Sequence, residues 1–173
     1  MPDGARYDIK IAVDAGYLFT VGQRVTNSSD KPLAIRPLGL VSRALKSHDP
    51  DSWTNHVGPM SVFGGKADYD VDYKTLDEGS GSQAFDNVSG WLGFTDKYWL
   101  TALVPGNATM SADFRRSPSG GYQADYALAP EVVAPGQALS TQARLFAGAK
   151  EKAWLDRYED AGIPKLSKSI DWG

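Results

Sequence analysis

The chain has 173 residues, 42% of them hydrophobic and 23% charged, and a formal net charge of −3, which together indicate one globular domain. Its positive and negative charges are interspersed and no run of about 18 apolar residues occurs, so neither a nucleic-acid surface nor a membrane span is expected. It contains no cysteine, which excludes disulfides, thiolate metal sites and cysteine nucleophiles.

The first third of the chain predicts strands, because apolar and polar residues alternate with a period of two. Residues 7–13 predict a half-buried strand, and a turn at 14–16 followed by a second run to residue 25 predicts an antiparallel hairpin. A third strand is predicted over 33–41, where Pro37 favours a sheet edge or a bulge. The residues expected to face inward from the first strand are Tyr7, Ile9, Ile11 and Val13.

The middle of the chain begins with a long connection, residues 42–59, which lacks a clear period and is typical of a functional or mobile loop. Tyr69, Val71 and Tyr73 then alternate with three aspartates, which predicts a strand with its carboxylates in solvent. The composition of residues 77–82 predicts a flexible loop. Further strands are predicted over residues 60–63, 91–94, 98–104, 108–115, 122–128 and 138–146.

One helix is predicted, from about residue 150 to 161, with Trp154, Leu155 and Tyr158 on one face. Gly162 and Pro164 follow it as stop signals. Many short strands separated by turn residues, with a single terminal helix, predict a mainly β fold, an antiparallel β-sandwich.

Catalytic and metal-binding patterns are weak in this sequence. The two histidines, His48 and His56, lie in the 42–59 connection, and the adjacent residues 47–49 (Ser-His-Asp) cannot form the spatial relay of a triad. The aspartates at 68, 70 and 72 have the spacing of the start of a calcium loop. However, Tyr73 stands where that loop needs glycine and Gly79 where it needs glutamate. No catalytic residue, metal site or cofactor is therefore predicted.

Aromatic residues are the remaining candidates for binding. Trp91, Phe94, Tyr98 and Trp99 lie within nine residues, and they could form a sugar-stacking or peptide-binding surface. Aromatic residues on strands more often belong to a sandwich core, which is the preferred interpretation. Trp53, isolated in the long connection, is expected near a surface groove or as a plug that fixes the loop to the sheet.

Two long motifs resemble the large periplasmic domain of YidC-type membrane protein insertases. The first is GWLGFTDKYWLTALVP at residues 90–105, and the second is LFAGAK at 145–150, followed by the helix and by GIPKL at 162–166. The ending SIDWG at 169–173 resembles the linker before that family's second membrane helix, and the early hairpin with YLFTV at 17–21 also fits. The resemblance covers nearly the whole chain and is closest in style to alphaproteobacterial members.

The resemblance implies a β-supersandwich, similar to that of mutarotases, on the periplasmic side between the first and second membrane helices. Residues 1–149 would form the sandwich, without some N-terminal strands of the full domain, residues 150–162 the C-terminal helix, and residues 163–173 the linker toward the second membrane helix. The membrane core that holds the insertion activity is absent, so no insertase active residue is carried over. The helix and linker residues that would join the domain to the membrane part are Trp154, Leu155, Tyr158, Ile163, Leu166, Ile170 and Trp172.

The function that the resemblance implies is assistance to the insertion and folding of inner-membrane proteins, as a scaffold or partner-binding module. The expected partners are the membrane-embedded insertase core of the same protein, Sec translocase subunits and nascent membrane proteins. A sheet edge left open by missing strands would also allow weak self-association.

A non-catalytic carbohydrate-binding or mutarotase-like module is the alternative. A catalytic mutarotase needs a histidine acid and a glutamate base across a concave sheet, and neither His48 nor His56 lies on a predicted strand. An open sheet face lined by tryptophan and a carboxylate would favour sugar binding, whereas a filled sandwich would favour a scaffold.

Overall fold

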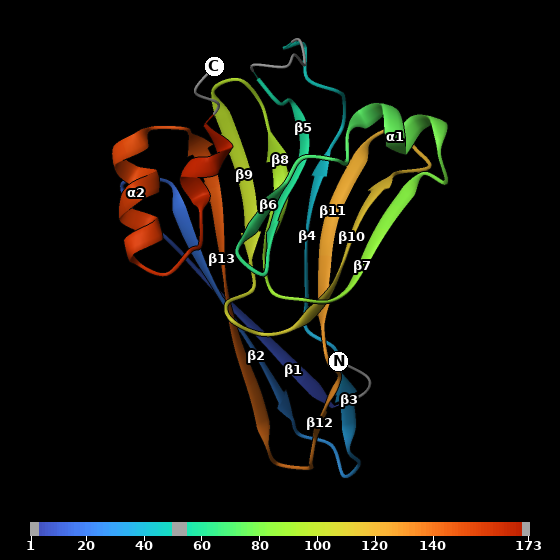
Figure 1. The fold of residues 1–173 in the computed structure, drawn as a ribbon. Coiled ribbons are helices and arrows are strands. Elements are labelled where there is room, and N and C mark those ends of the chain that lie inside the picture. The colour runs from blue at the N-terminus through green and yellow to red at the C-terminus, as the bar shows by residue number, and fades with distance from the viewer. Residues whose placement is uncertain (1–3, 50–54, 171–173) are drawn as a thin grey trace.

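The computed structural model describes residues 4–49 and 55–170, and most of this part of the chain is β-structure. Antiparallel strands form a seven-stranded sheet and a four-stranded sheet that face each other, with a short helix after the last strand (Figure 1). The predicted antiparallel β-sandwich with a C-terminal helix is thus confirmed. The large sheet consists, in spatial order, of β1 (Ala5–Val13), β2 (Leu18–Asn27), β13 (Ala138–Ala149), β9 (Trp99–Val104), β8 (Gly90–Thr95), β5 (Gly58–Phe63) and β6 (Lys66–Asp68).

The second sheet covers only part of the first. Its edge strand β4 follows Pro37, and the single strand predicted over 33–41 is broken there into two strands of different sheets. Pro37 has no N–H to donate, which explains both the break and the edge position. The four-stranded sheet consists of β4 (Leu38–Arg43), β11 (Tyr122–Leu128), β10 (Met110–Arg116) and β7 (Ser82–Val88), and a small third sheet consists of β12 (Glu131–Val133) and β3 (Leu33–Ile35).

The large sheet is buried on both faces at its centre. On β8, Leu92 packs between the two sheets, whereas its neighbour Trp91 points to the opposite side. On β9 the same alternation sends Leu103 inward and Leu100 outward. This two-sided burial explains why the predicted strands in this region read as nearly continuous apolar runs. The outer face is covered by helix α2 (Lys152–Asp160), which packs with Trp91, Leu100 and their neighbours in a second core cluster.

The strand predicted over residues 69–73 is wrong. The chain instead forms a short helix, α1 (Tyr73–Glu78), because Asp72 caps its first turn: the Asp72 carboxylate accepts a hydrogen bond from the Thr75 N–H at 2.6 Å. Two predicted inward side chains, Val71 and Tyr73, are buried nonetheless. The flexible loop predicted at 77–82 is shorter than expected, since α1 continues to Glu78 and β7 begins at Ser82.

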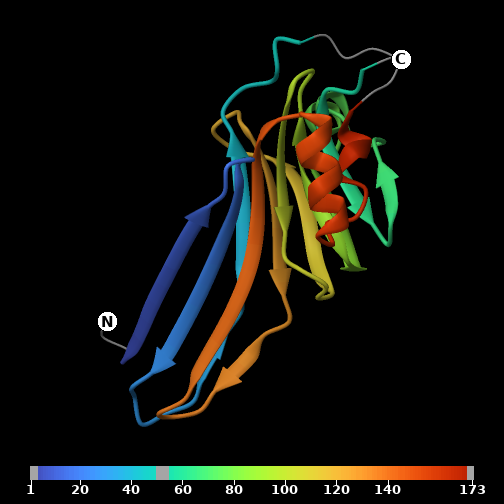
Figure 2. The same ribbon diagram turned by 90° about the vertical axis from the view of Figure 1, so that its left-hand side faces the viewer.

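The first strand forms as predicted but is not half-buried. Paired residues run in register from Ala5↔Asn27 to Val13↔Phe19, which confirms the hairpin of β1 and β2. The predicted inward side chains are nevertheless exposed, because the four-stranded sheet ends at β4 and does not extend over β1. Figure 2 shows β1, β2 and the start of β13 as an arm that reaches away from α2. The exposed fractions are 47% for Tyr7, 65% for Ile9, 64% for Ile11 and 56% for Val13.

Candidate interaction surfaces

Helix α2 is seated on the outer face of the large sheet by its apolar side. Leu155 is fully buried and Tyr158 nearly so, with the Tyr158 ring centroid 5.9 Å from that of Phe146 on β13. Trp154 is only half-buried and stacks on Tyr158, with ring centroids 5.9 Å apart and an interplanar angle of 23°. The helix ends at Asp160, and Gly162 follows with φ of 90°, a backbone conformation that glycine adopts without steric cost. The side chains predicted to share one face therefore pack together.

The turn between β1 and β2 binds helix α2 through a hydrogen bond between Asp14 and Tyr158. The Tyr158 hydroxyl lies 2.7 and 2.9 Å from the two carboxylate oxygens of Asp14, to one of which it donates its hydrogen. The same carboxylate accepts the N–H groups of Gly16 and Leu18, each at 3.0 Å. Partial burial raises the pKa of Asp14, but the hydrogen bond from Tyr158 and those of the backbone, with the charge of Arg157, lower it more, so its pKa lies below the ordinary value. Burial and this bond together raise the pKa of Tyr158.

Gly16 allows the helix to approach the turn. A Cβ at this position would lie 2.2 Å from the Tyr158 hydroxyl oxygen and 2.4 Å from the Trp154 ring. Any larger residue at 16 would therefore push α2 away from the sheet. Sequence reasoning identified Gly16 only as a turn residue, since its contact with α2 spans more than a hundred positions.

Residues 163–170, the described part of the predicted linker, form a packed cover over the sheet. Ile163 and Leu166 are fully buried in the cluster beneath α2, and Ile170 packs against it. Residues Leu166–Ser169 form a 3-10 turn, η1. The structure thus brings six of the seven helix and linker residues into one unit with the large sheet: Trp154, Leu155, Tyr158, Ile163, Leu166 and Ile170. The seventh, Trp172, lies outside the described residues.

Four side chains from different parts of the chain hold the backbone of this segment. The Trp91 indole N–H donates to the Pro164 carbonyl at 2.7 Å, across 73 positions of sequence. Tyr69 donates to the Lys168 carbonyl at 2.8 Å, and the Lys150 ammonium to the Ser169 carbonyl at 2.6 Å. Glu159 accepts the Ser167 N–H at 2.6 Å. We call these four residues the linker clamp; none was singled out for this role from the sequence, because no local pattern marks a side chain that bonds so far along the chain.

The inner face of the arm presents apolar side chains that the second sheet does not cover. Directly paired residues point to the same side, so the exposed side chains of β1 continue across β2 and β13. The lower part of this face borders a groove of about 200 Å³, which is closed on its other side by Ile35, Pro37 and Leu38. Val25 is buried on this face, and Ala143 and Leu145 pack against the core between the sheets. The remaining residues form the arm face: Tyr7, Ile9, Ile11, Val13, Phe19, Val21, Gln23, Leu139 and Thr141.

The arm face does not have the character expected of a sugar site. No tryptophan is among its residues or those that line the groove, and Gln23 and Thr141 lie directly opposite each other in the strand register. The carboxylate that lines the groove, that of Asp8, is paired with Arg6. The arm face is therefore open, but it lacks the tryptophan that would favour sugar binding.

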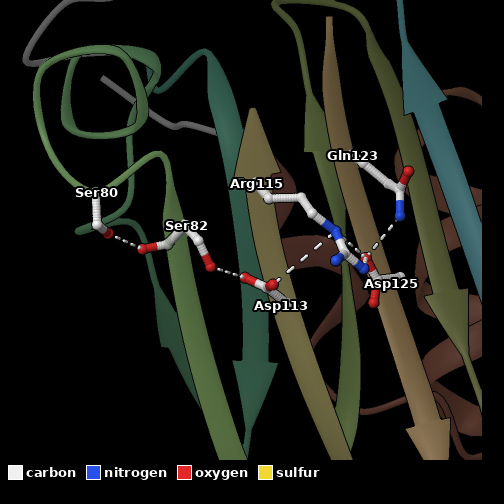
Figure 3. A network of polar contacts seen from close by, with 6 residues as sticks. All are labelled: Ser80, Ser82, Asp113, Arg115, Gln123 and Asp125. Carbon is white, nitrogen blue, oxygen red and sulfur yellow. Dashed lines mark hydrogen bonds and ion pairs between the residues drawn. The ribbon is translucent and has the colours of Figure 1, made fainter. Parts of the chain in front are cut away.

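The outer face of the four-stranded sheet carries a polar network that spans β7, β10 and β11 (Figure 3). Asp113 and Asp125 lie directly opposite each other on β10 and β11, where two like charges would repel. Arg115 donates to Asp125 from Nε at 3.0 Å and also contacts Asp113, while Gln123 donates to Asp125 at 2.8 Å. The hydrogen bond to Asp125 raises the pKa of Arg115. Both carboxylates are thus committed to a cross-strand network.

The aspartates and histidines considered above as metal or catalytic candidates mostly make local structural contacts. Asp72 caps α1, and Asp68 accepts the N–H of Asp70 at 2.9 Å. The His56 ring nitrogen lies 2.7 Å from the Pro59 carbonyl oxygen, whereas His48 is exposed. Within residues 4–49 and 55–170, His, Asp and Glu side chains do not gather in threes to hold a metal ion. Trp53 lies outside the described residues.

The aromatic cluster of residues 91–99 divides between core and surface. Trp91 and Phe94 are buried, which confirms the core interpretation for these two. Tyr98 and Trp99 are exposed, so the core interpretation is wrong for them. Across the described ranges, no helix combines the length and the apolar character needed to cross a membrane.

Comparison with known proteins identifies close relatives. The family model described as the YidC periplasmic domain matches residues 1–173. The chain is 41% identical to the membrane protein insertase YidC of Zymomonas mobilis, covering 98% of this chain and 30% of that protein. The insertases YidC of Acidiphilium cryptum and Rickettsia prowazekii are 37% and 36% identical, over 98% and 99% of this chain. The chain spans about three tenths of the length of these relatives.

Solved structures share the fold. A GH36 α-galactosidase from Geobacillus stearothermophilus superposes with a TM-score of 0.60 at 12% identity, over 85% of this chain and 22% of the enzyme. The protein Slr1438 from Synechocystis superposes with a TM-score of 0.54 at 11% identity, over 85% of this chain and 56% of its own. At these identities the likeness is one of fold alone.

Proposed function

Because the chain belongs to the family of YidC periplasmic domains, we propose that it is the periplasmic part of a membrane protein insertase of the bacterial inner membrane. In this role it assists insertion and folding as a scaffold, without catalysing a reaction itself. Its first partner is the membrane-embedded core of the same protein. This partner is inferred because the related insertase is more than three times as long as this chain. Sec translocase subunits and nascent membrane proteins are further partners in this proposal.

The observation that carries the proposal is the way in which α2 and residues 163–170 are fixed to the sandwich. Leu155, Ile163 and Leu166 are fully buried, and the linker clamp bonds the intervening backbone. Motion of the segment that follows residue 170 would therefore be transmitted to the large sheet as a whole. We propose that α2 and residues 163–170 are a stiff coupling between the sandwich and the membrane core.

The arm face has a place in the same proposal. Exposed β-branched side chains on an open sheet face, next to the unpaired edge of β4, are typical of a surface that another β-element covers. We propose that additional strands of the full-length protein extend the four-stranded sheet beyond β4 and cover this face.

The absence of catalysis is supported by the positions of the acidic and histidine side chains. Asp113 and Asp125 share Arg115, Asp72 caps a helix, and His56 lies against a backbone carbonyl. The three carboxylates are thus engaged in structural contacts, whereas a catalytic constellation sets its acid beside a base or nucleophile at a site open to substrate. The fold likeness to an α-galactosidase adds nothing to the contrary, because 12% identity carries over no residue role.

A complementation assay tests the coupling directly. In cells depleted of their own insertase, the full-length protein carrying Gly16→Ala is expected to insert a model membrane protein more slowly, because a Cβ at 16 displaces α2. Gly22→Ala is the matched control: the nearest atom to its Cβ is 3.8 Å away, and it lies on the same hairpin. Substitution of His48, which is exposed in the loop after β4, is expected to be tolerated. Equal insertion by the Gly16→Ala and Gly22→Ala proteins at equal abundance would contradict the coupling.

A further inference from the structure

A patch of exposed apolar side chains lies at one end of the sandwich, on the turn between β8 and β9. Tyr98 is 62% exposed and Trp99 60%, although the same strand pair buries Trp91 and Phe94. Leu45, in the loop after β4, is 69% exposed. Packing of the core does not require any of these three side chains, and together with Lys97 they form what we call the aromatic tip.

The aromatic tip is fixed beside the last described residues of the chain. Lys150 donates its backbone N–H to the Tyr98 carbonyl at 2.9 Å, and its ammonium group donates to the Ser169 carbonyl. The same side chain thus links the tip to the segment 163–170. Figures 1 and 2 agree in placing the β8–β9 turn at the end of the molecule opposite β12.

The loop with Leu45 is tied to the same turn. Arg43 donates to the Asp96 carboxylate at 2.7 Å and to the Leu45 carbonyl at 2.8 Å. Asp49 accepts the Lys97 N–H at 3.1 Å. The exposed side chains are therefore presented from a rigid base of hydrogen bonds and not from a free loop.

The chemistry of the tip matches the boundary between lipid headgroups and acyl chains. Tryptophan and tyrosine are enriched at this boundary, where their rings meet apolar neighbours and their polar atoms meet water. The Lys97 ammonium lies 5.1 Å from the centroid of the Tyr98 ring, where it can extend toward headgroup phosphates while the ring stays apolar. Asp96 is paired with Arg43, so its charge does not oppose this placement.

We propose that Leu45, Tyr98 and Trp99 insert into the interface of the lipid bilayer and hold this end of the sandwich on the membrane surface. The inference rests on the proposed function, since it needs a membrane beside the C-terminal end of the domain. The tip and the coupling segment then share one boundary: residues 163–170 set the distance of the sandwich from the bilayer, and the tip sets its tilt.

The test uses the full-length protein, reconstituted in vesicles of phosphatidylcholine and phosphatidylglycerol, with an environment-sensitive fluorophore at Lys97→Cys. This chain contains no cysteine. Any cysteine elsewhere in the full-length protein is replaced first, so that only position 97 carries the label. Lipids with a quenching group near the headgroup are expected to quench the label. The control label at Ala134→Cys, which is exposed on the turn after β12 at the opposite end of the sandwich, is expected to be unaffected.

A second measurement removes the tip. In the 173-residue chain labelled at position 97, the double substitution Tyr98→Ser and Trp99→Ser is expected to lower partition into these vesicles by about tenfold or more, because it deletes most of the inserting apolar area. Val132→Ser, at an equally exposed residue of β12, should leave partition unchanged. High salt should have little effect, since the attraction is apolar.

Three results would overturn the inference. The first is that lipid does not quench the label at position 97. The second is that the label is shielded from an aqueous quencher but is not quenched by lipid, which indicates a protein partner. The third is that high salt abolishes partition into the vesicles. Each can be separated from failure of the proposed function. If the full-length protein inserts its substrates normally and its Gly16→Ala variant does not, the coupling holds even when the tip makes no contact with lipid.

Discussion

The pair formed by Asp14 and Tyr158 fastens α2 to the β1–β2 turn across 144 positions of sequence. The carboxylate accepts one side-chain and two backbone donors, and the net effect lowers its pKa in the folded protein. Since a carboxyl group whose pKa falls on folding stabilises the fold above its unfolded pKa, the contact should be fully effective at neutral pH. Its contribution is lost as the pH falls through the lowered folded-state pKa.

Tyr158→Phe should reduce the free energy of unfolding by about 1.5 kcal/mol near neutral pH, the lower end for a hydrogen bond to a charged group, because Asp14 is itself exposed. The difference from the wild-type chain should narrow as the pH falls below 3.8, the ordinary pKa of Asp14, since both proteins then lose the carboxylate. Urea unfolding at a series of pH values measures both effects. A difference that stays constant through the acid range would assign the loss to packing and not to the carboxylate.

The elements at the C-terminal end behave as one unit with the large sheet. Helix α2 contributes Leu155 and Tyr158 to the cluster that also holds Trp91 and Phe146, and residues 163–170 close it. The cluster is apolar and continuous, so its burial supplies most of the free energy that keeps the helix in place. The linker clamp then fixes the direction in which the chain continues.

Leu155→Ala and Trp154→Ala should differ in cost. Leu155 is fully buried, and its truncation should destabilise the chain by about 2–5 kcal/mol through lost burial and the cavity left behind. Trp154 is half-buried, so its truncation should cost less than the 3–5 kcal/mol typical of a buried aromatic residue. Thermal or urea unfolding of both variants measures the difference. A larger loss for Trp154→Ala would mean that its stacking on Tyr158 and its contact with Arg157 matter more than burial.

The sequence predicts these elements where local patterns determine them. The period-two runs give most strands, and the apolar face with Gly162 and Pro164 gives the helix. The strand proposed at 69–73 fails because the N-cap of Asp72 outweighs a short alternation. Strand β7 is missed because its two partly buried residues, Phe85 and Val88, stand among polar ones. The linker clamp lies beyond such reasoning, since Trp91 and Pro164 meet only through the packing of a whole sheet.

At the scale of the whole molecule, the two sheets of the sandwich are unequal. Seven strands face four, and the difference leaves the arm face and the edges of β1 and β4 without a covering element in the described part of the chain. An apolar face beside open edges favours pairing with another chain. The isolated chain should therefore associate weakly with itself at high concentration.

Ile9→Lys together with Ile11→Lys should weaken this self-association without loss of stability. Both side chains are more than 60% exposed, so the free energy of unfolding should change by no more than about 0.5 kcal/mol for each substitution. Lysine on an edge strand also opposes edge-to-edge pairing. Sedimentation equilibrium compares these variants with Leu45→Lys, an equally exposed residue at the other end. If the Leu45→Lys chain were the one to lose association, the arm face would not be the contact.

If residues 163–170 are a stiff extension of the sandwich, hydrogen exchange of the 173-residue chain should reveal it in the backbone amides of this segment. The Ile163 amide donates to the Tyr158 carbonyl of α2 at 3.0 Å, and the Lys168 and Ile170 amides donate to carbonyls within the segment at 3.1 and 3.0 Å. These amides should exchange as slowly as amides of β9 and β13, because the segment opens only when the large sheet opens. Exchange at the rate of an unstructured peptide, while the sheet amides remain protected, would contradict it.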